Sequence, residues 1–534
     1  MAVSVVPAAA VGWLRLRPER DPHRVVWDGL TSLLMSLTGG PLRRGLWIAG
    51  LLVLGLLLTL RLLPRADYLP EGNRNLVFAF ILPPPGANVE FIERVMGRTV
   101  IERLAPHLRG EREPVVRHYF FVAVPRGVFM GVRARDPEQA GALVPLVNEV
   151  VGGFPDTLAF ARRASLFGGF GEGRTIDMEL QGRDIGRVMA AAQSAFGLIR
   201  QTLPGATVRP LPGLELAEPE LRLHPRERRL AEAGWDRKVA ASVVRALGDG
   251  LYVGDWFDGE QTRDIILRTR PWKSPGELEA LPLATPSAGV LPLSELMRME
   301  RTAGPAELRR VDRRRTVTLQ VSPPQAVSLE EALEKLKREV APRIADLLPA
   351  DGGIRYGGTA DKLKQALSSM SGSFLLAVAI LYLLMSALFR SFRDSLLVIL
   401  TLPLATVGGV IGLQLLNRYT FQPMDLLTMI GFIILLGLVV NNAILLVHQT
   451  RAAERDGLPR REAVRQAVRV RLRPIFMSTL TSIFGMLPLM LMPGAGSELY
   501  RGLATVIVGG MTTSLLFTLL LLPSLLRLGE GRRA

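Results

Sequence analysis

The sequence contains no cysteine, which excludes both a disulfide framework and a thiolate metal site. Histidine is also scarce, and the five histidines are scattered at His23, His107, His118, His224 and His448. No apolar run contains a row of carboxylates, so a route for metal ions through a membrane has little support. The sequence lacks a nucleophile-base arrangement and a phosphate-cradling loop, so we expect neither an enzyme nor a bound cofactor.

Acidic residues are outnumbered, with 49 Asp and Glu against 65 Lys and Arg and a formal net charge of +16. Such an excess can indicate nucleic-acid binding. Much of the positive charge here flanks apolar runs on one side, which is instead typical of a membrane protein. The hydrophobic content of 48% and the mean hydropathy of +0.25 agree with that class, and we expect no nucleic-acid partner.

Six apolar runs reach or approach the length that a membrane-spanning helix needs, about 20 residues. We predict spans at 45–64, 369–390, 394–416, 424–449, 472–493 and 499–527. The residues between the first two spans, about 65–367, contain no such run. They predict a large soluble portion that follows a linker at 65–72.

The arginines indicate which side of the membrane each loop faces. Residues 450–474 carry many more arginines than acidic residues, which is typical of a cytoplasmic loop. We predict an amphipathic helix at 450–471 on that side, and a cytoplasmic or interfacial segment at 15–44. The large soluble portion must then lie on the opposite side of the membrane.

The first fourteen residues, MAVSVVPAAAVGWL, are apolar but too short to span a bilayer. They also lack the basic residues that begin a signal peptide. We interpret residues 1–14 as the end of a truncated span.

The soluble portion repeats a pattern of an apolar strand followed by an amphipathic helix. Three copies lie at 75–104, 174–199 and 317–340. Asn88 is placed to cap the first of these helices, and Ser328 with Glu331 forms a capping box in the last. A hairpin at 118–151 leads into a further helix. Units of this size predict two α+β sandwiches of the split βαβ, ferredoxin-like type, whereas 222–310 breaks the rhythm and predicts an inserted subdomain.

Three stretches near the C-terminus carry a resemblance to a known family. They are GLVVNNAILLV at 437–447, RLRPIFMSTLTSIFGMLPL at 471–489 and GAGSELYRGLATVIVGG at 494–510. Together with the large soluble portion after the first span, they resemble the C-terminal half of a resistance-nodulation-division (RND) efflux transporter of the hydrophobe/amphiphile efflux type. In that family two such halves form one polypeptide about twice this length.

The resemblance implies porter subdomains at 73–172 and at 173–221 plus 311–365, with a channel-docking subdomain inserted at 222–310. The expected fold is an α-helical membrane bundle of six spans plus a partial one, which carries a periplasmic α+β portion. The resemblance also implies a homotrimer in the bacterial inner membrane. Its expected partners are a periplasmic adaptor protein and an outer-membrane channel.

Asn441 and Asn442 lie in the middle of the fourth span, where the first half of such pumps usually carries two proton-binding aspartates. The resemblance implies that these amides hydrogen-bond to a carboxylate on a neighbouring helix, because a charge there would cost about 2.5–3.5 kcal/mol. Many multidrug members carry a lysine at the position of Asn441, which leaves Arg471 as the matching cation, and Ser478 matches a hydroxyl position. The amides can equally be ordinary interhelical contacts, and Arg471 a plain cytoplasmic anchor.

No predicted span carries a carboxylate near its centre. Asp425 and His448 lie near the two ends of their span, where water reaches, so neither is a favoured proton carrier. We therefore expect transport to require a missing N-terminal half with an aspartate pair, either encoded separately or lost by truncation.

Aromatic residues in the soluble portion are the candidates for a substrate pocket: Tyr119, Phe120, Phe121, Phe129, Phe167 and Phe170. They can line an apolar pocket for amphiphiles, but aromatic residues at strand spacing are also typical of a plain core. Two functions stay open. The chain is either the permease half of a proton-driven efflux pump for amphiphilic small molecules or drugs, or a non-transporting membrane scaffold or truncated pump fragment.

Overall fold

The structure is a computed structural model, and it describes residues 24–68, 74–84, 86–124, 127–155, 157–164, 174–214, 218–248, 250–304, 307–492, 494 and 497–528. The truncated span expected at 1–14 lies outside the described residues. So do two of the candidate pocket residues, Phe167 and Phe170.

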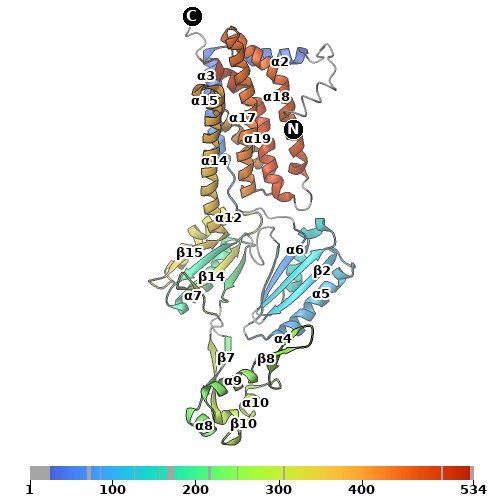
Figure 1. Cartoon of the computed structure of the whole chain (residues 1–534), viewed down its shortest axis with the longest axis vertical. Coiled ribbons are helices and arrows are strands. Elements are labelled where there is room, and N and C mark those ends of the chain that lie inside the picture. The colour runs from blue at the N-terminus through green and yellow to red at the C-terminus, as the bar shows by residue number, and fades with distance from the viewer. Residues whose placement is uncertain are drawn as a thin grey trace.

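Among the described residues, six helical segments are long and apolar enough to cross a membrane. They are α3 (Pro41–Leu62), α14 (Thr359–Phe389), α15 (Phe392–Ile399) with α16 (Leu402–Leu416), α17 (Leu426–Arg455), α18 (Arg460–Leu491) and α19 (Arg501–Leu526). A shorter helix, α2 (Arg24–Leu37), lies across the end of this bundle (Figure 1). The soluble portion extends from the opposite end.

Two expected boundaries differ in the structure. The span expected at 394–416 is two helices, because Pro403 has no N–H to donate to the carbonyl of Ile399 and the helix breaks before it. A separate amphipathic helix at 450–471 does not form. Instead α17 ends at Arg455, Gly457 adopts a left-handed φ of 89°, and α18 runs unbroken from Arg460 into the span.

Glycines allow α16 and α19 to pack at backbone contact. A Cβ atom on Gly408 would lie 2.4 Å from the carbonyl oxygen of Gly509, and a Cβ atom on Gly509 would lie 2.4 Å from that of Gly408. Small residues at membrane helix contacts permit this approach. As a result α19 lies in the interior of the bundle, whereas α3 and α14 lie at its edge.

The first sheet has the strand order β2-β3-β1-β4, with every neighbouring pair antiparallel. Its strands are β1 (Val77–Leu82), β2 (Val116–Val124), β3 (Gly127–Ala134) and β4 (Leu158–Arg163). Helices α5 (Arg98–Leu108) and α6 (Leu143–Val151) pack on one face over a buried core that includes Ala79, Met130 and Val147. The chain therefore runs strand, helix, strand, strand, helix, strand.

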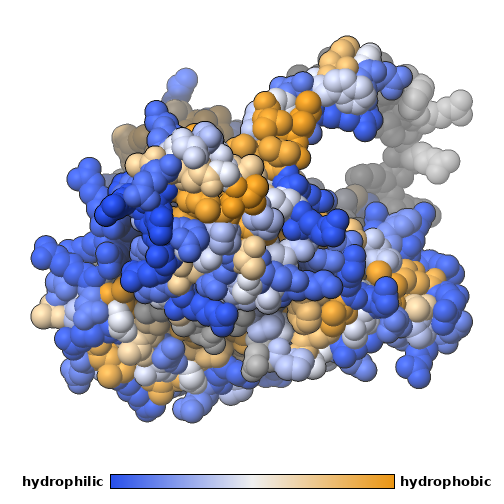
Figure 2. Space-filling view, turned by 90° about the horizontal axis from the view of Figure 1, so that it is seen from below, coloured by the Kyte–Doolittle hydropathy of each residue, from blue (hydrophilic) through white to orange (hydrophobic). Residues whose placement is uncertain are grey.

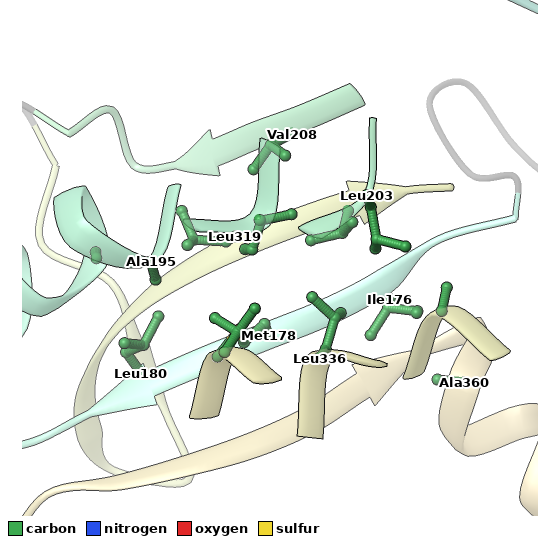
Figure 3. Close-up of a cluster of buried hydrophobic side chains, with 14 of the residues drawn as sticks. Ile176, Met178, Leu180, Ala195, Leu203, Val208, Leu319, Leu336 and Ala360 are labelled. Atoms are coloured by element: carbon green, nitrogen blue, oxygen red, sulfur yellow. The ribbon is translucent and has the colours of Figure 1, made fainter. Parts of the chain in front are cut away.

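The second sheet repeats this arrangement with the order β6-β14-β5-β15, and the short β13 (Arg310–Val311) pairs with β14. Its strands are β5 (Ile176–Gln181), β6 (Thr207–Leu211), β14 (Arg314–Ser322) and β15 (Gly353–Gly358). Its helices are α7 (Ile185–Thr202), α12 (Leu329–Lys335) and α13 (Ala341–Ala345). Figure 3 shows Met178 of β5, Leu319 of β14 and Leu336 converging in the core between sheet and helices.

A two-stranded ribbon of β7 (Glu218–Pro225) and β12 (Met297–Gly304) leads away from the second sheet (Figure 1). Beyond it lie α8 (Glu227–Glu232), α9 (Arg237–Leu247), β8 (Leu251–Phe257), β9 (Thr262–Leu267), α10 (Pro275–Glu279), β10 (Pro282–Thr285), β11 (Gly289–Pro292) and α11 (Leu293–Leu296). This end has its own small core, which includes Leu230, Leu278 and Leu296.

The segment that follows α3 helps to join the bundle to the second sheet, in addition to α14, which continues directly from β15. Ala66 forms a β-bridge with Met424, just before α17. Asp67 accepts a hydrogen bond from the backbone N–H of Leu329 and forms a buried ion pair with Arg174 at 2.8 Å. The start of α12 and the start of α17 are therefore held to the same short segment.

Candidate functional site

Asn442 joins α17 to α18 inside the bundle. Its amide donates to Oγ1 of Thr479 at 3.0 Å, and the hydroxyl of Ser478 donates to its Oδ1 at 3.3 Å. Asn442 is 8% exposed and Thr479 is 1% exposed. The structure thus brings together two of the predicted residues, Asn442 and Ser478. It adds Thr479, which the polar run Ser-Thr at 478–479 could have indicated.

Asn441 lies on a different face of α17, because adjacent residues of a helix are rotated by about 100°. It is exposed and makes no side-chain hydrogen bond to the described part of the chain. It belongs to an exposed stripe at helical spacing with Ile430, Ile434 and Gly437, and a Cβ on Gly437 would meet nothing within 4 Å. An amide in the middle of an apolar, uncovered stripe would be costly against lipid, so this face is suited to contact another polar helix.

Arg471 does not contact the asparagine pair. It lies about two turns before Ser478 on α18, roughly 10 Å along the axis. Its guanidinium donates to Oε1 of Gln449 at 3.0 Å, while its Nε is buried with no hydrogen-bond partner in the described residues. Gln449 was not anticipated from the sequence.

Asp425 corrects one expectation. It lies one residue before α17 begins, but its side chain is completely buried, so water does not reach it. It caps the helix by accepting from the N–H of Thr428 and also accepts from Gln422, while Asp67 faces it from the segment after α3. Burial, reinforced by the nearby Asp67 charge, raises the pKa of Asp425 to about 6. His448, at the other end, is exposed as expected.

The aromatic candidates divide between the two faces of the first sheet, because side chains alternate along a strand. Phe120 and Phe129 lie on the face without helices, 5.3 Å apart between ring centroids. There they form a continuous cluster, the aromatic face, which consists of Phe78, Phe80, Phe120, Phe129 and Phe160. Tyr119 and Phe121 pack instead into the helix-covered core.

A cation from the second sheet reaches the aromatic face. The guanidinium carbon of Arg209, on β6, lies 5.0 Å from the centroid of the Phe80 ring, and that of Arg162 lies 5.8 Å from the same centroid. The Nε of Arg209 is buried without a hydrogen-bond partner among the described residues. Burial lowers the pKa of Arg209. No pattern in the sequence indicates this contact, which joins strands far apart in the chain.

The described residues contain no group of three or more His, Asp or Glu side chains arranged to hold a metal ion. The rings of the aromatic face make it suited to apolar and aromatic molecules, and the exposed amide of Asn441 makes its face of α17 suited to exchange hydrogen bonds with a further helix.

Comparison with known proteins identifies a family and a solved structure of similar fold. Residues 134–529 match the model of the AcrB/AcrD/AcrF family. The fold is similar to that of a solved heavy metal efflux pump, with a TM-score of 0.75 and 22% sequence identity. That match covers 95% of this chain and 53% of the solved pump, so the chain spans about half the length of that protein.

Proposed function

Since the chain belongs to the AcrB/AcrD/AcrF family of RND permeases, we propose that it is the permease half of a proton-driven efflux pump for amphiphilic small molecules. In this proposal the bundle lies in the bacterial inner membrane and the two sheets lie in the periplasm. The second half is a companion polypeptide segment, since the chain matches only 53% of the solved pump.

The observation that carries the proposal is the different environment of the two asparagines. Asn442 holds α17 to α18 through Thr479 and Ser478, while Asn441 is left on the uncovered stripe of α17. We assign Asn441 to hydrogen-bond a titrating carboxylate of the companion half. Arg471 then acts from a distance, through the positive potential it supplies at the Gln449 end of the contact between α17 and α18.

The aromatic face supports the choice of an amphiphilic cargo. Its five phenylalanine rings offer apolar surface on a strand face that no helix of the first sheet covers. Arg209 and Arg162 add cations over the Phe80 ring of this face. We assign Phe120 and Phe129, among the predicted candidates, to contact the exported molecule.

The same proposal assigns roles to the subdomains and names the partners of the pump. The two sheet units are porter subdomains of the split βαβ type, at 73–172 and at 173–221 plus 311–365, and 222–310 docks to the outer-membrane channel. The pump is a homotrimer that also binds a periplasmic adaptor protein. The repeated strand order of the two sheets supports the pairing of the porter subdomains.

Reconstitution in liposomes tests this proposal. We expect the chain alone to export no fluorescent amphiphile under an imposed pH gradient. Export should appear when the chain is reconstituted with a companion half that carries an aspartate pair in its fourth span. Export by the chain alone would refute the need for a companion. Absence of export with every such companion would refute the transport function itself.

The second candidate is a non-transporting scaffold. It is favoured by the sequence, which has no carboxylate near the centre of a span. A scaffold predicts that Asn441→Ala is silent in every transport assay, whereas the pump proposal predicts a loss. Export of heavy metal ions, as in the solved pump of similar fold, is a weaker candidate because the described residues hold no three-carboxylate or histidine group for an ion.

A further inference from the structure

Asp67 is a charged residue in the short segment that follows α3, yet its side chain is completely buried. Its carboxylate forms an ion pair with Arg174 at 2.8 Å, and the side chain of Arg174 is only 8% exposed. The Nε–H of Arg174 is not aligned for a hydrogen bond, so this contact is an ion pair alone. A buried ion pair is weak evidence for stability, because the cost of desolvation offsets the attraction. The position of the pair is therefore more informative than its strength.

The pair lies where the bundle meets the second sheet. We call residues 65–68 the joint segment. Helix α12, whose first residue contacts Asp67, lies directly at the end of the bundle (Figure 1). The opposite end of the molecule has a largely hydrophilic surface that is interrupted by apolar patches (Figure 2), as expected for a portion outside the membrane. The joint segment is thus a place where movement in the membrane can reach the soluble portion.

On the membrane side, the joint segment is bonded to the residues around the start of α17. The N–H of Asp67 donates to the carbonyl of Met424 at 3.1 Å, and the N–H of Met424 donates to the carbonyl of Arg65 at 3.2 Å. The N–H of Leu426, the first residue of α17, donates to the carbonyl of Tyr68 at 3.3 Å. These bonds form a short parallel ladder, so the joint segment moves with the start of α17.

On the other side, the joint segment is bonded to the start of α12. The carboxylate of Asp67 accepts from the N–H of Leu329 at 3.3 Å. The next residue, Glu330, donates its N–H to the carbonyl of Ala66 at 3.3 Å, and its carboxylate accepts from the N–H of Ala66 at 2.6 Å. The N–H groups of a first helical turn have no partner within the helix, so these bonds satisfy them. The start of α12 therefore follows the joint segment.

Arg174 extends the contact to β5. It lies two residues before this strand begins, and its Nη2 donates to the carbonyl of Val327, just before α12. Its neighbour Thr175 accepts a hydrogen bond from the N–H of Thr359, the first residue of α14, at 3.2 Å. Both connections between the bundle and the second sheet, the joint segment and α14, therefore reach the same end of β5.

Helix α17 is suited to carry a displacement to this point. It is one continuous helix from Leu426 to Arg455, and Asn442 lies roughly 25 Å along it from Asp425. The backbone hydrogen bonds of a helix are satisfied within it, and close-packed interiors transmit strain because they compress little. A shift of α17 at its contact with α18 therefore reaches the joint segment.

We propose that Asp67 and Arg174 form a positioning pair, which makes the start of β5 and the start of α12 follow displacements of α17. Asp67 supplies the contact on the membrane side, and Arg174 supplies the contact to the second sheet. Neither side chain is assigned to touch the exported molecule. The proposal rests on the proposed function only in that export involves a displacement of α17, because the mechanical link itself is a property of this chain.

Hydrogen exchange in the purified full chain tests the link, with Asn442→Ala as the perturbation of α17. In the native background we expect this variant to speed amide exchange in β5 and in the first turn of α12 by about tenfold, because local opening becomes easier there. In the Asp67→Asn background the same perturbation should add nothing, since distant sites without a connecting contact act independently. Exchange in β3 of the first sheet is the internal reference and should stay unchanged.

Arg65→Gln is the matched control. Arg65 belongs to the same segment and pairs with Glu334 at 2.6 Å, but the two side chains are 51% and 44% exposed, so the pair contributes little. The response to Asn442→Ala should persist in this background. Arg174→Gln should remove the response, whereas Arg174→Lys keeps a positive charge beside Asp67 and should retain most of it. This comparison separates loss of the charge from general damage to the fold.

Export in the source organism tests the role of the pair in transport, with the native gene replaced by each variant. Asp67→Asn should lower the maximal export rate of a fluorescent amphiphile by about tenfold. It should leave the half-saturating concentration unchanged, because the pair acts on movement and not on binding of the exported molecule. Arg65→Gln should leave both quantities unchanged.

An undiminished response of β5 to Asn442→Ala in the Asp67→Asn background would overturn the proposal. So would an equal loss of exchange protection in the first sheet, because the pair would then only stabilise the fold. Export by Asp67→Asn at the native rate would also show that the pair does not position the second sheet for transport. If the native chain exports no amphiphile while the exchange response depends on Asp67, the proposed function fails and the link remains.

Discussion

The amide of Asn442 donates to Oγ1 of Thr479 at 3.0 Å, while the neighbouring Asn441 lies about 100° further around α17 and is exposed. The two residues are chemically identical and adjacent in sequence, yet one completes the contact between α17 and α18 while the other lies on an uncovered stripe. We therefore expect Asn442 to contribute to the stability of the chain and Asn441 to contribute to transport.

Asn442→Ala should lower the free energy of unfolding of the chain by about 1 kcal/mol, because it removes two interhelical hydrogen bonds worth about 0.6 kcal/mol each. Asn441→Ala, its matched control, should leave that free energy unchanged and reduce export in the presence of the companion half. Denaturant titration in detergent measures the first effect and liposome export the second. Equal destabilisation by both variants would contradict the assignment.

On the first sheet, Phe129→Ala should affect export, whereas Phe121→Ala should affect stability. The ring centroid of Phe129 lies 5.0 Å from that of Phe78 and 5.2 Å from that of Phe80 on the aromatic face. Its removal should therefore weaken export with little loss of stability. Phe121 packs against Gly97 in the helix-covered core, and its removal should cost about 3 kcal/mol. Thermal unfolding and the concentration dependence of export distinguish the two. If only Phe121→Ala changed the concentration dependence of export, the exported molecule would not bind at the aromatic face.

Gly408→Ala should disrupt the contact between α16 and α19. The new Cβ would lie 2.4 Å from the carbonyl oxygen of Gly509, so the backbones must separate, at a cost of about 1–3 kcal/mol. Gly50→Ala is the control, since a Cβ on this glycine of α3 would meet nothing within 4 Å. Both are measured by denaturant titration. If Gly50→Ala lowered the free energy of unfolding as much as Gly408→Ala, the effect would come from the flexibility of glycine and not from the contact between α16 and α19.

The buried carboxyl of Asp425 should make stability depend on pH. Because its pKa is raised from 3.8 to about 6, the folded state holds a proton that the unfolded state releases, and the free energy of unfolding should fall as pH rises between these values. The full effect is about 3 kcal/mol, since a pKa difference of one corresponds to about 1.4 kcal/mol. Above pH 6 this contribution is constant.

Asp425→Asn should remove that slope, because the amide oxygen still caps α17 by accepting from Thr428 but has no proton to lose. Thermal unfolding between about pH 4 and about pH 8 is the measurement that checks it. Glu90→Gln, at an exposed ion pair with Arg94, serves as the control and should leave the profile unchanged. Persistence of the slope in Asp425→Asn would assign it to another carboxyl, of which Asp67 is the nearest.

Elements whose cause is local can be predicted from the residues alone. Apolar runs of sufficient length became the spanning helices, because the backbone of such a segment can satisfy its hydrogen bonds only within itself. Asn88 and Ser328 cap the helices where they were predicted, since a side-chain acceptor and the first free N–H groups lie within one turn. The family resemblance was likewise carried by short stretches of contiguous residues, and the family match confirms it.

Which side of each helix or strand contacts its neighbours depends on how the elements pack together. The helical period fixes the angle between Asn441 and Asn442 but not which of them meets Thr479, because that depends on how α17 rotates against α18. The burial of Asp425 required the segment after α3 to fold over it, and the contact of Arg209 with Phe80 required two sheets from distant parts of the chain to approach each other. These relationships are set by packing between elements, which local patterns of residues do not specify.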